Sequence, residues 1–232
     1  NLPKKVELIL GNEIYIETYT NLIEQEKIES VEKLINKKIK KLERKDVESK
    51  FLIERAKVAK GNIALLVSGD PLIATTHVAL LVDAKNAKIE TKIINNSSIY
   101  TAAPGKAGLQ MYKFGKTASI PTPRENYNPT SWFDIIKENL GHGAHTLVLL
   151  DTEPKPMDAK LALELIEKTD NNKILNNKKL VIVSRVGERN EKISYGAIES
   201  LKKASLGKPP FAIIVPGKLH QLEEEYLEGC TR

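Results

Sequence analysis

Apolar residues occur along this chain either in short uninterrupted runs or at every third or fourth position. The clearest run, Ile63–Val67, is typical of a strand that is buried on both faces of a parallel sheet. It ends at the turn-forming sequence 68–71, after which we expect a helix over Leu72–Ala87 and a strand over Ile89–Ile94. Residues 63–94 therefore predict a βαβ unit with two parallel strands.

Further elements are expected before that unit. Apolar residues between the polar ends of Glu13–Glu17 favour a strand, and the ten residues at the start have a helical pattern. A helix is predicted over Ser30–Leu42, with Ser30 as its N-cap, and another over Asp46–Ala59. In the first of these helices the lysines between positions 37 and 41 would form a solvated face beside an apolar stripe.

The second half of the chain alternates between the two patterns. Strands are predicted at Thr117–Pro121, His145–Leu150, Lys179–Ser184 and Phe211–Val215. Helices are predicted at Thr130–Asn139, Asp158–Lys168, Tyr195–Ala204 and His220–Leu227. A polar, turn-prone segment at residues 95–98 separates the two halves, so we expect two α/β domains, residues 1–96 and 97–232.

Composition and charge argue against several classes of protein. The chain has 232 residues, and no apolar run approaches the roughly 20 residues of a membrane span. The net charge of +6 comes from lysines spread along the chain, and aromatic residues are only 5%, too few for a base-stacking surface. A single cysteine, Cys230, and histidines without ligand spacing disfavour disulfides and a metal site. We expect a cytoplasmic protein that binds no nucleic acid, membrane or metal.

Polar residues follow several of the predicted strands. Gly69 and Asp70 come after the first apolar run, at the strand end where ligands bind in open α/β sheets. Gly69 leaves space for a ligand, and Asp70 can accept hydrogen bonds. Asp151 follows a later run in the same way. Each segment could also be an ordinary turn, and the histidines alone are more typical of structural roles. By themselves the residues predict an α/β protein with a small-molecule cleft.

Seven segments, in order along the chain, carry a resemblance to a known family. They are Gly69–His77 (GDPLIATTH), Asn96–Tyr100 (NSSIY), Gly108–Lys116 (GLQMYKFGK), Pro129–Asp134 (PTSWFD), His145–Leu147 (HTL), Pro209–Pro210 and Ile214–His220 (IVPGKLH). Gly-Asp-Pro is common in a broad superfamily, whereas the sequences at 74–77 and 108–116 are more specific. On these segments the chain resembles the diphthine synthases of the tetrapyrrole methylase superfamily over essentially its whole length.

The resemblance implies two α/β domains with S-adenosylmethionine bound in a cleft between them, and a homodimer. Carried over by position, the residues expected to contact the cofactor are Gly69, Asp70, Pro71, Ile73, Ser98, Ile99, Leu150, Val186 and Phe211. Apolar side chains among them would enclose the adenine and thioether, and Asp70 would be a polar anchor. Phe211 stands where some relatives are expected to have histidine, and no residue is assigned as a general base.

The implied reaction is the repeated methylation of the amino group on the 3-amino-3-carboxypropyl arm of a histidine in elongation factor 2, the expected protein substrate. S-adenosylmethionine would become S-adenosylhomocysteine. No residue pattern distinguishes the addition of three methyl groups from four. Two alternatives stay open: another methyltransferase of the superfamily that acts on a tetrapyrrole or ribosomal RNA, and a non-catalytic binding protein with the same fold.

The N-terminal region departs from the family pattern. Diphthine synthases begin with a short apolar strand and a Gly-rich turn of the form Phe-Ile-Gly-Leu-Gly-Leu, which this sequence lacks. Asn1–Leu10 corresponds to the helix that follows this strand in the family. We therefore expect either that a first strand precedes Asn1, or that the first domain lacks one strand of its sheet and one wall of the cofactor site.

Overall fold

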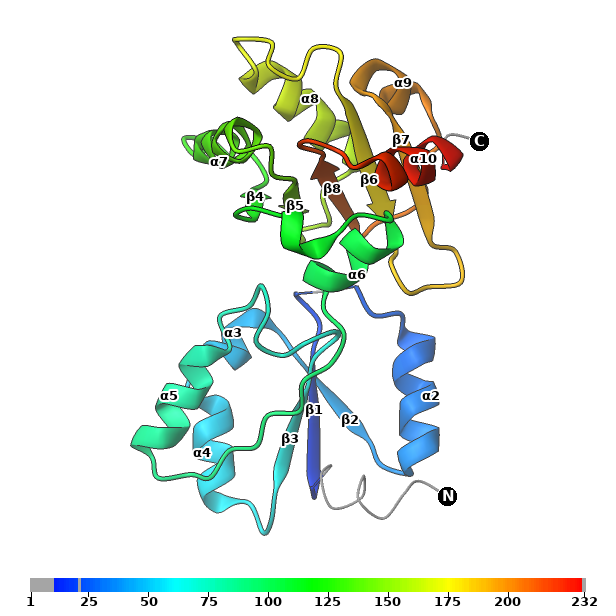
Figure 1. Cartoon of the computed structure of the whole chain (residues 1–232). Coiled ribbons are helices and arrows are strands. Elements are labelled where there is room, and N and C mark those ends of the chain that lie inside the picture. The colour runs from blue at the N-terminus through cyan, green and yellow to red at the C-terminus, as the bar shows by residue number, and fades with distance from the viewer. Residues whose placement is uncertain (1–10, 21, 231–232) are drawn as a thin grey trace. The chain divides into compact units, whose positions relative to one another are not determined.

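A computed structural model describes residues 11–20 and 22–230, and the chain divides into two compact units (Figure 1). One unit ends at Ser98 and the other begins at Ile99, close to the expected domain boundary. Each unit contains a β-sheet with helices packed against it, which confirms the predicted α/β class. The predicted helical start at residues 1–10 lies outside the described residues. No helix in the described ranges is both long enough and apolar enough to cross a membrane.

The N-terminal unit contains a three-stranded parallel sheet in the order β2-β1-β3. Its strands are β1 (Glu13–Glu17), β2 (Ile39–Leu42) and β3 (Ile63–Leu66). Its helices are α2 (Gln25–Ile35), α3 (Arg44–Val47), α4 (Phe51–Val58) and α5 (Val78–Asn86). Because side chains alternate along a strand, Ile14 and Ile16 pack toward α2, whereas Tyr15 packs toward α3 and α4 on the opposite face (Figure 1).

The predicted helix over Ser30–Leu42 is wrong in its second half. Helix α2 ends at Ile35, followed by its C-cap Asn36, whose φ of 51° is left-handed. The last four residues of the predicted helix, Ile39–Leu42, form the parallel strand β2 instead. Ser30 lies inside α2, where its hydroxyl donates to the Glu26 carbonyl at 2.7 Å, so it is not an N-cap. The lysines at 37–41 therefore do not share one helix face. Pairing with β1 decides the conformation of Ile39–Leu42, as tertiary context often overrides a helical period.

The predicted βαβ unit over residues 63–94 is also wrong. Strand β3 is present, but all four of its residues are half-buried, and among the described residues it pairs only with β1. The expected strand Ile89–Ile94 has no regular structure, and Ile93 and Ile94 are exposed. A strand needs a neighbouring strand as its hydrogen-bond partner, and among the described residues this segment has no such neighbour. The helix expected from Leu72 begins only at Val78.

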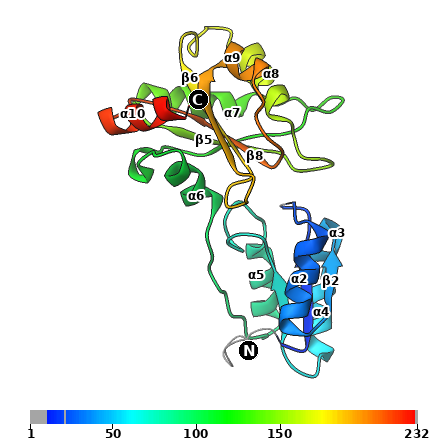
Figure 2. The same ribbon diagram turned by 90° about the vertical axis from the view of Figure 1, so that its right-hand side faces the viewer.

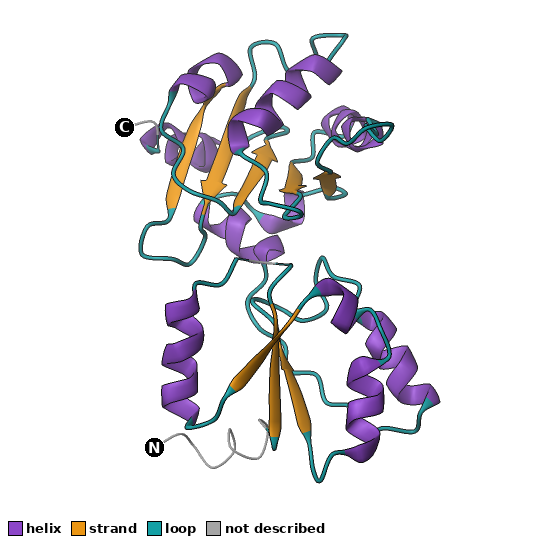
Figure 3. Cartoon of the chain, turned by 180° about the vertical axis from the view of Figure 1, so that it is seen from behind, coloured by secondary structure: helices purple, strands orange, loops and turns teal. Residues whose placement is uncertain are grey.

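The C-terminal unit contains a five-stranded mixed sheet in the order β4-β5-β8-β6-β7 (Figure 3). The strands are β4 (Ala118–Ile120), β5 (Thr146–Leu150), β6 (Lys179–Ser184), β7 (Lys192–Ala197) and β8 (Phe211–Val215). The helices are α6 (Ile99–Lys106), α7 (Ser131–Gly141), α8 (Ala159–Thr169), α9 (Ile198–Lys203) and α10 (Gln221–Gly229), with a short 3-10 helix, η1 (Met111–Lys113).

Most elements predicted for this half are confirmed within a few residues. The exception is the helix expected over Tyr195–Ala204, because Tyr195 belongs to β7 and the helix begins at Ile198. Helices α7, α8 and α9 cover one face of the sheet, and α6 and α10 cover the other. In Figure 2, α8 and α9 lie on one side of the strands and α6 lies on the other. Both faces are covered, so strands β6 and β8 are almost completely buried.

Candidate functional site

Three strand ends and one strand start meet at one edge of the C-terminal sheet. Strands β4, β5 and β6 run in one direction and β8 runs in the other. The registers pair Ile120 with Leu150, Leu149 with Ala212, and Ser184 with Phe211. Leu150 therefore lies beside Phe211 at this edge, which is the kind of edge where α/β proteins bind ligands.

Four of the residues expected to contact a cofactor belong to this unit, and we call Ile99, Leu150, Val186 and Phe211 the C-terminal group. Leu150 and Phe211 are only 9% and 8% exposed, because their side chains enter the core under α7–α9. Ile99 and Val186 instead pack on the opposite face of the sheet, beside α6 and α10. The structure thus places Leu150 and Phe211 together, with both side chains buried.

Asp151 connects the loops that follow β4 and β5. Its carboxylate accepts hydrogen bonds from the backbone N–H groups of Thr122 at 2.9 Å and Glu153 at 3.2 Å. The Asp151 N–H donates to the Ile120 carbonyl at 3.1 Å. The Thr122 hydroxyl oxygen beside it is buried and has no hydrogen-bond partner among the described residues. Such orphaned groups are rare in native proteins, and a ligand can supply the missing partner.

The remaining expected residues gather at the carboxyl edge of the N-terminal sheet, and we call Gly69, Asp70, Pro71, Ile73 and Ser98 the N-terminal group. The chain turns there after β3 at Gly69, whose φ of 98° favours glycine. A Cβ atom built on Gly69 would lie 3.5 Å from the Ser97 carbonyl oxygen, so the segment leading to Ser98 passes close to the turn. Ile73 is 38% exposed, so its side chain is accessible to a ligand.

Asp70 holds this arrangement together. Its side chain is 9% exposed and accepts hydrogen bonds from the Asn95 amide at 3.0 Å, the Leu72 N–H at 2.9 Å and the Asn96 N–H at 3.3 Å. The bond from Asn95, followed by those from the backbone, holds the pKa of Asp70 below its ordinary value despite burial. The ionised carboxylate of Asp70 therefore connects the turn at Gly69 to residues 95–96 by hydrogen bonds.

Sequence reasoning missed a cluster at the same edge. Glu17, at the end of β1, is 1% exposed and accepts hydrogen bonds from the N–H groups of Tyr19 at 3.1 Å and Thr20 at 3.0 Å, and from the Thr20 hydroxyl. Tyr19 in turn contacts His77, which is 5% exposed. The sequence did contain a signal for this cluster, because the polar residues Glu17–Thr20 come directly after the buried positions of a strand.

A second polar network joins three of the segments that carry the resemblance, deep in the C-terminal unit. His145 is fully buried, and its Nδ1 accepts a hydrogen bond from the Gly217 N–H at 2.8 Å. Its Nε2 therefore carries the proton and donates to Glu223, at 3.3 Å. Burial lowers the pKa of His145 and would raise that of Glu223, but bonds from the Gln110 and His220 N–H groups and from Lys113 lower the Glu223 pKa to about 2. This network is structural, as expected for a lone histidine.

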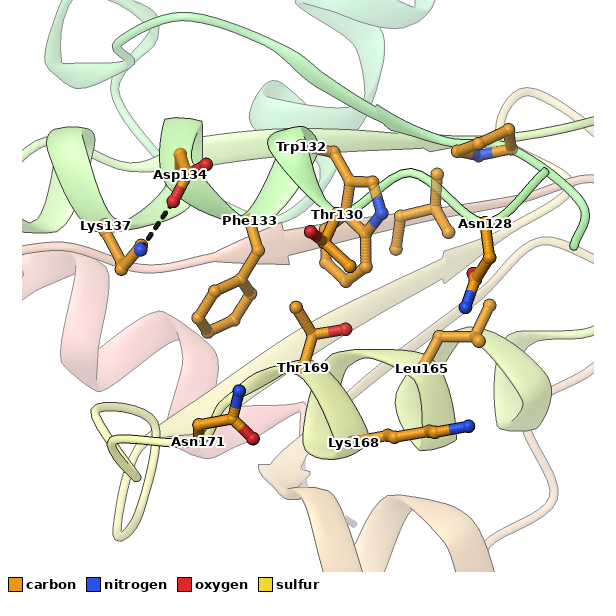
Figure 4. A pocket seen from close by; sticks show the side chains of 12 residues that line it. Asn128, Thr130, Trp132, Phe133, Asp134, Lys137, Leu165, Lys168, Thr169 and Asn171 are labelled. Carbon is orange, nitrogen blue, oxygen red and sulfur yellow. Dashed lines mark ion pairs between the residues drawn. The ribbon is translucent and has the colours of Figure 1, made fainter. Parts of the chain in front are cut away.

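A separate cavity of about 260 Å³ lies between α7 and α8 (Figure 4). Its walls include Trp132, Phe133 and Leu165, and Thr130 and Thr169 project into it (Figure 4). None of the residues expected to contact a cofactor lines this cavity. The candidate site is therefore placed at the two strand edges, because position at the carboxyl ends of strands is a stronger indication of function than cavity size alone.

Comparisons with known proteins bear on the sequence and the fold of the whole chain. Residues 4–202 match the family of tetrapyrrole (corrin/porphyrin) methylases. The chain is 45% identical to the diphthine synthase of Methanocaldococcus jannaschii, over 94% of this chain and 88% of that protein. It is 40% identical to the diphthine synthase of Methanothermobacter thermautotrophicus, over 93% of this chain and 84% of the relative. A crystal structure of diphthine synthase superposes on all of this chain and 90% of that one, with a TM-score of 0.86 and 35% identity.

The fold and the sequence together define a methylase of the two-domain α/β type. The chain therefore belongs to the tetrapyrrole methylase family, and within it to the diphthine synthases.

Proposed function

We propose that this chain is an S-adenosylmethionine-dependent methyltransferase that repeatedly methylates the amino group of the 3-amino-3-carboxypropyl-histidine of elongation factor 2. The observation that supports the proposal is the position of most of the expected cofactor contacts at the ends of strands. The N-terminal group lies at the carboxyl edge of a parallel sheet, and Leu150 and Phe211 of the C-terminal group lie side by side at an edge of the other sheet. Ser98 of the first group and Ile99 of the second are consecutive in the sequence.

The residues present fit S-adenosylmethionine. Ile73 offers exposed apolar surface of the kind that the adenine and thioether require. At the edge where Leu150 and Phe211 lie, the buried Thr122 hydroxyl has no hydrogen-bond partner among the described residues, and a polar group of the ligand could supply one. Ionised Asp70 can influence the affinity for S-adenosylmethionine without contacting it, because its hydrogen bonds fix the turn that carries the other residues of the N-terminal group.

The chemistry places modest demands on these residues. When bound, S-adenosylmethionine supplies an electrophilic methyl group on a sulfonium. An amine is already a nucleophile once it is deprotonated, so the residues of the chain mainly have to bind, orient and exclude water. The hydrogen-bonded Gly69 turn and the Asp151 link between two loops both provide a preformed frame for that orientation.

Methyl transfer with labelled S-adenosylmethionine tests the proposal. Elongation factor 2 that carries the aminocarboxypropyl arm should be labelled, and the unmodified factor should not. Equal labelling of both would contradict the specificity for the arm. Labelling of a tetrapyrrole or of ribosomal RNA instead would favour another activity of the superfamily, and the absence of any cofactor binding would favour a non-catalytic role.

Asp70→Ala should weaken the binding of S-adenosylmethionine, because the Gly69 turn loses the hydrogen bonds that fix it. The expected loss is on the order of 1 to 3 kcal/mol, measured by calorimetry. Asp170→Ala is the matched control: Asp170 is also 9% exposed and also accepts bonds from two backbone N–H groups, those of Ile174 and Leu175. Asp170→Ala should lower the free energy of unfolding by a similar amount but leave the affinity for S-adenosylmethionine unchanged. Equal affinities of Asp70→Ala and the wild type would show that Asp70 is only a turn residue.

We also propose that the protein is a cytoplasmic homodimer without a metal requirement. Light scattering after gel filtration should give twice the mass of the 25.9 kDa chain. A monomeric mass at micromolar concentration would contradict the dimer.

A further inference from the structure

The loop Pro71–His77 between β3 and α5 is held in a costly conformation. Sequence reasoning expects a helix here, but the loop has no regular structure, and Ala74 has a φ of 56°. Residues with a Cβ rarely adopt this left-handed region, and they persist there only where the surroundings hold them. Ile73, which belongs to the N-terminal group, lies inside this loop and is exposed.

Hydrogen bonds to one carbonyl close the loop. The Pro71 carbonyl oxygen accepts from the Thr75 hydroxyl at 3.0 Å and from Nδ1 of His77 at 2.8 Å. A carbonyl can only accept, so Nδ1 of His77 carries the proton and Nε2 offers a lone pair. The loop is therefore fastened at its first and last residues by a buried imidazole of defined tautomer.

Tyr19 connects this imidazole to the neighbouring strand. Its hydroxyl lies 3.2 Å from Nε2 of His77 and donates to it, and the two rings pack edge to face. Tyr19 follows β1, whereas Pro71 follows β3, so the pair joins the exits of two adjacent parallel strands. The Arg44 guanidinium lies 5.9 Å from the Tyr19 ring centroid.

We propose that Tyr19 and His77 are positioning residues that set the conformation of the Pro71–His77 loop, and through Ile73 and the Gly69 turn the affinity for S-adenosylmethionine. The inference rests on the proposed function. Apolar packing contributes little to holding the loop in this conformation, because the side chains of Ile73, Val78 and Val82, in the loop and along α5, are exposed. A side-chain relay of hydrogen bonds therefore supplies the constraint that a packed core would otherwise supply.

The test combines two variants that remove the same hydrogen bond. Tyr19→Phe removes only the hydroxyl and keeps the ring that packs against His77. His77→Asn keeps a donor near the position of Nδ1 for the Pro71 carbonyl and loses the acceptor for Tyr19. Tyr15→Phe is the matched control, since Tyr15 lies in the middle of β1 and its hydroxyl donates to Glu13, the first residue of the strand, at 2.6 Å.

Calorimetry with S-adenosylmethionine and hydrogen exchange of the loop are measured on each variant. Tyr19→Phe should raise the dissociation constant about fivefold, the effect of losing one neutral hydrogen bond. The double variant should bind like His77→Asn alone, because the second change has nothing left to remove. Amides of residues 72–77 should exchange faster in Tyr19→Phe than in the wild type, and Tyr15→Phe should alter neither the affinity nor this exchange.

Two failures can be told apart. If the wild type binds S-adenosylmethionine and Tyr19→Phe binds it within twofold, the positioning role is refuted while the proposed function stands. If the wild type binds none, the proposed function fails. In either case, unchanged hydrogen exchange of residues 72–77 in Tyr19→Phe would refute the proposed effect of Tyr19 on the loop.

Discussion

The two sheets use similar apolar strands in different ways. Strand β8, with the sequence FAIIV, is buried at every position between two layers of helices. Strand β3, with the sequence IALL, is half-buried at every position and pairs, within the described residues, with β1 alone. Packing therefore positions the C-terminal group, whereas the hydrogen bonds to Asp70 and the bond between Tyr19 and His77 position the N-terminal group. An apolar run in the sequence is therefore compatible with a buried strand, but the burial of the strand depends on the elements that pack against it.

The largest expected effect tests this difference directly. Ile213→Ala, at a fully buried position of β8, should lower the free energy of unfolding of its unit by about 3 to 4 kcal/mol. Leu65→Ala, on half-buried β3, should cost only about 1 to 2 kcal/mol because less surface is removed from contact. The single tryptophan, Trp132, lies in α7 and reports the C-terminal unit by fluorescence. Hydrogen exchange reports the N-terminal one. Equal costs would remove the contrast between the sheets.

A slightly smaller effect is expected at Glu223. Glu223→Gln should destabilise the C-terminal unit by about 3 kcal/mol, because Lys113 and several N–H groups lose a buried anion. The pKa of Glu223 is about 2 in the folded protein and 4.5 ordinarily, so its contribution is complete above pH 4.5 and is lost as the pH falls toward 2. Denaturant unfolding from pH 7 to pH 2 should therefore show a steeper loss of stability below pH 4.5 in the wild type than in Glu223→Gln. Parallel curves would place the acid sensitivity elsewhere.

Gly69→Ala should have the smallest effect on stability and a specific effect on binding. The φ of 98° strains any residue with a Cβ, at a cost of about 1 to 2 kcal/mol, although the space beside Ser97 is sufficient. Gly105→Ala in α6 serves as the control, because its φ is not positive and no atom lies within 4 Å of the added Cβ. Calorimetry should show weaker binding of S-adenosylmethionine only for Gly69→Ala. The same affinity in both variants would remove the turn from the candidate site.

The C-terminal half could be predicted well because its apolar runs pair with one another within the described chain. Strands such as Thr146–Leu150 and Phe211–Val215 needed only their own pattern. The N-terminal half was harder, because Ile39–Leu42 has a helical spacing and becomes a strand only by pairing with β1. Ile89–Ile94 has a strand pattern, but no strand within residues 11–20 and 22–230 pairs with it. The cluster of Glu17, Tyr19 and His77 depends on two strand exits meeting, which no single stretch of sequence shows.

Hydrogen exchange with and without S-adenosylmethionine tests most directly whether both strand edges bind the cofactor. Protection is expected at both groups, in residues 69–73 and 98–99 and in residues 150–151 and 185–187. The increase should be larger in the N-terminal group, because hydrogen bonds rather than a closed core hold it in the free protein. Protection confined to one unit, or to the cavity between α7 and α8, would contradict the cofactor contacts proposed for the other group.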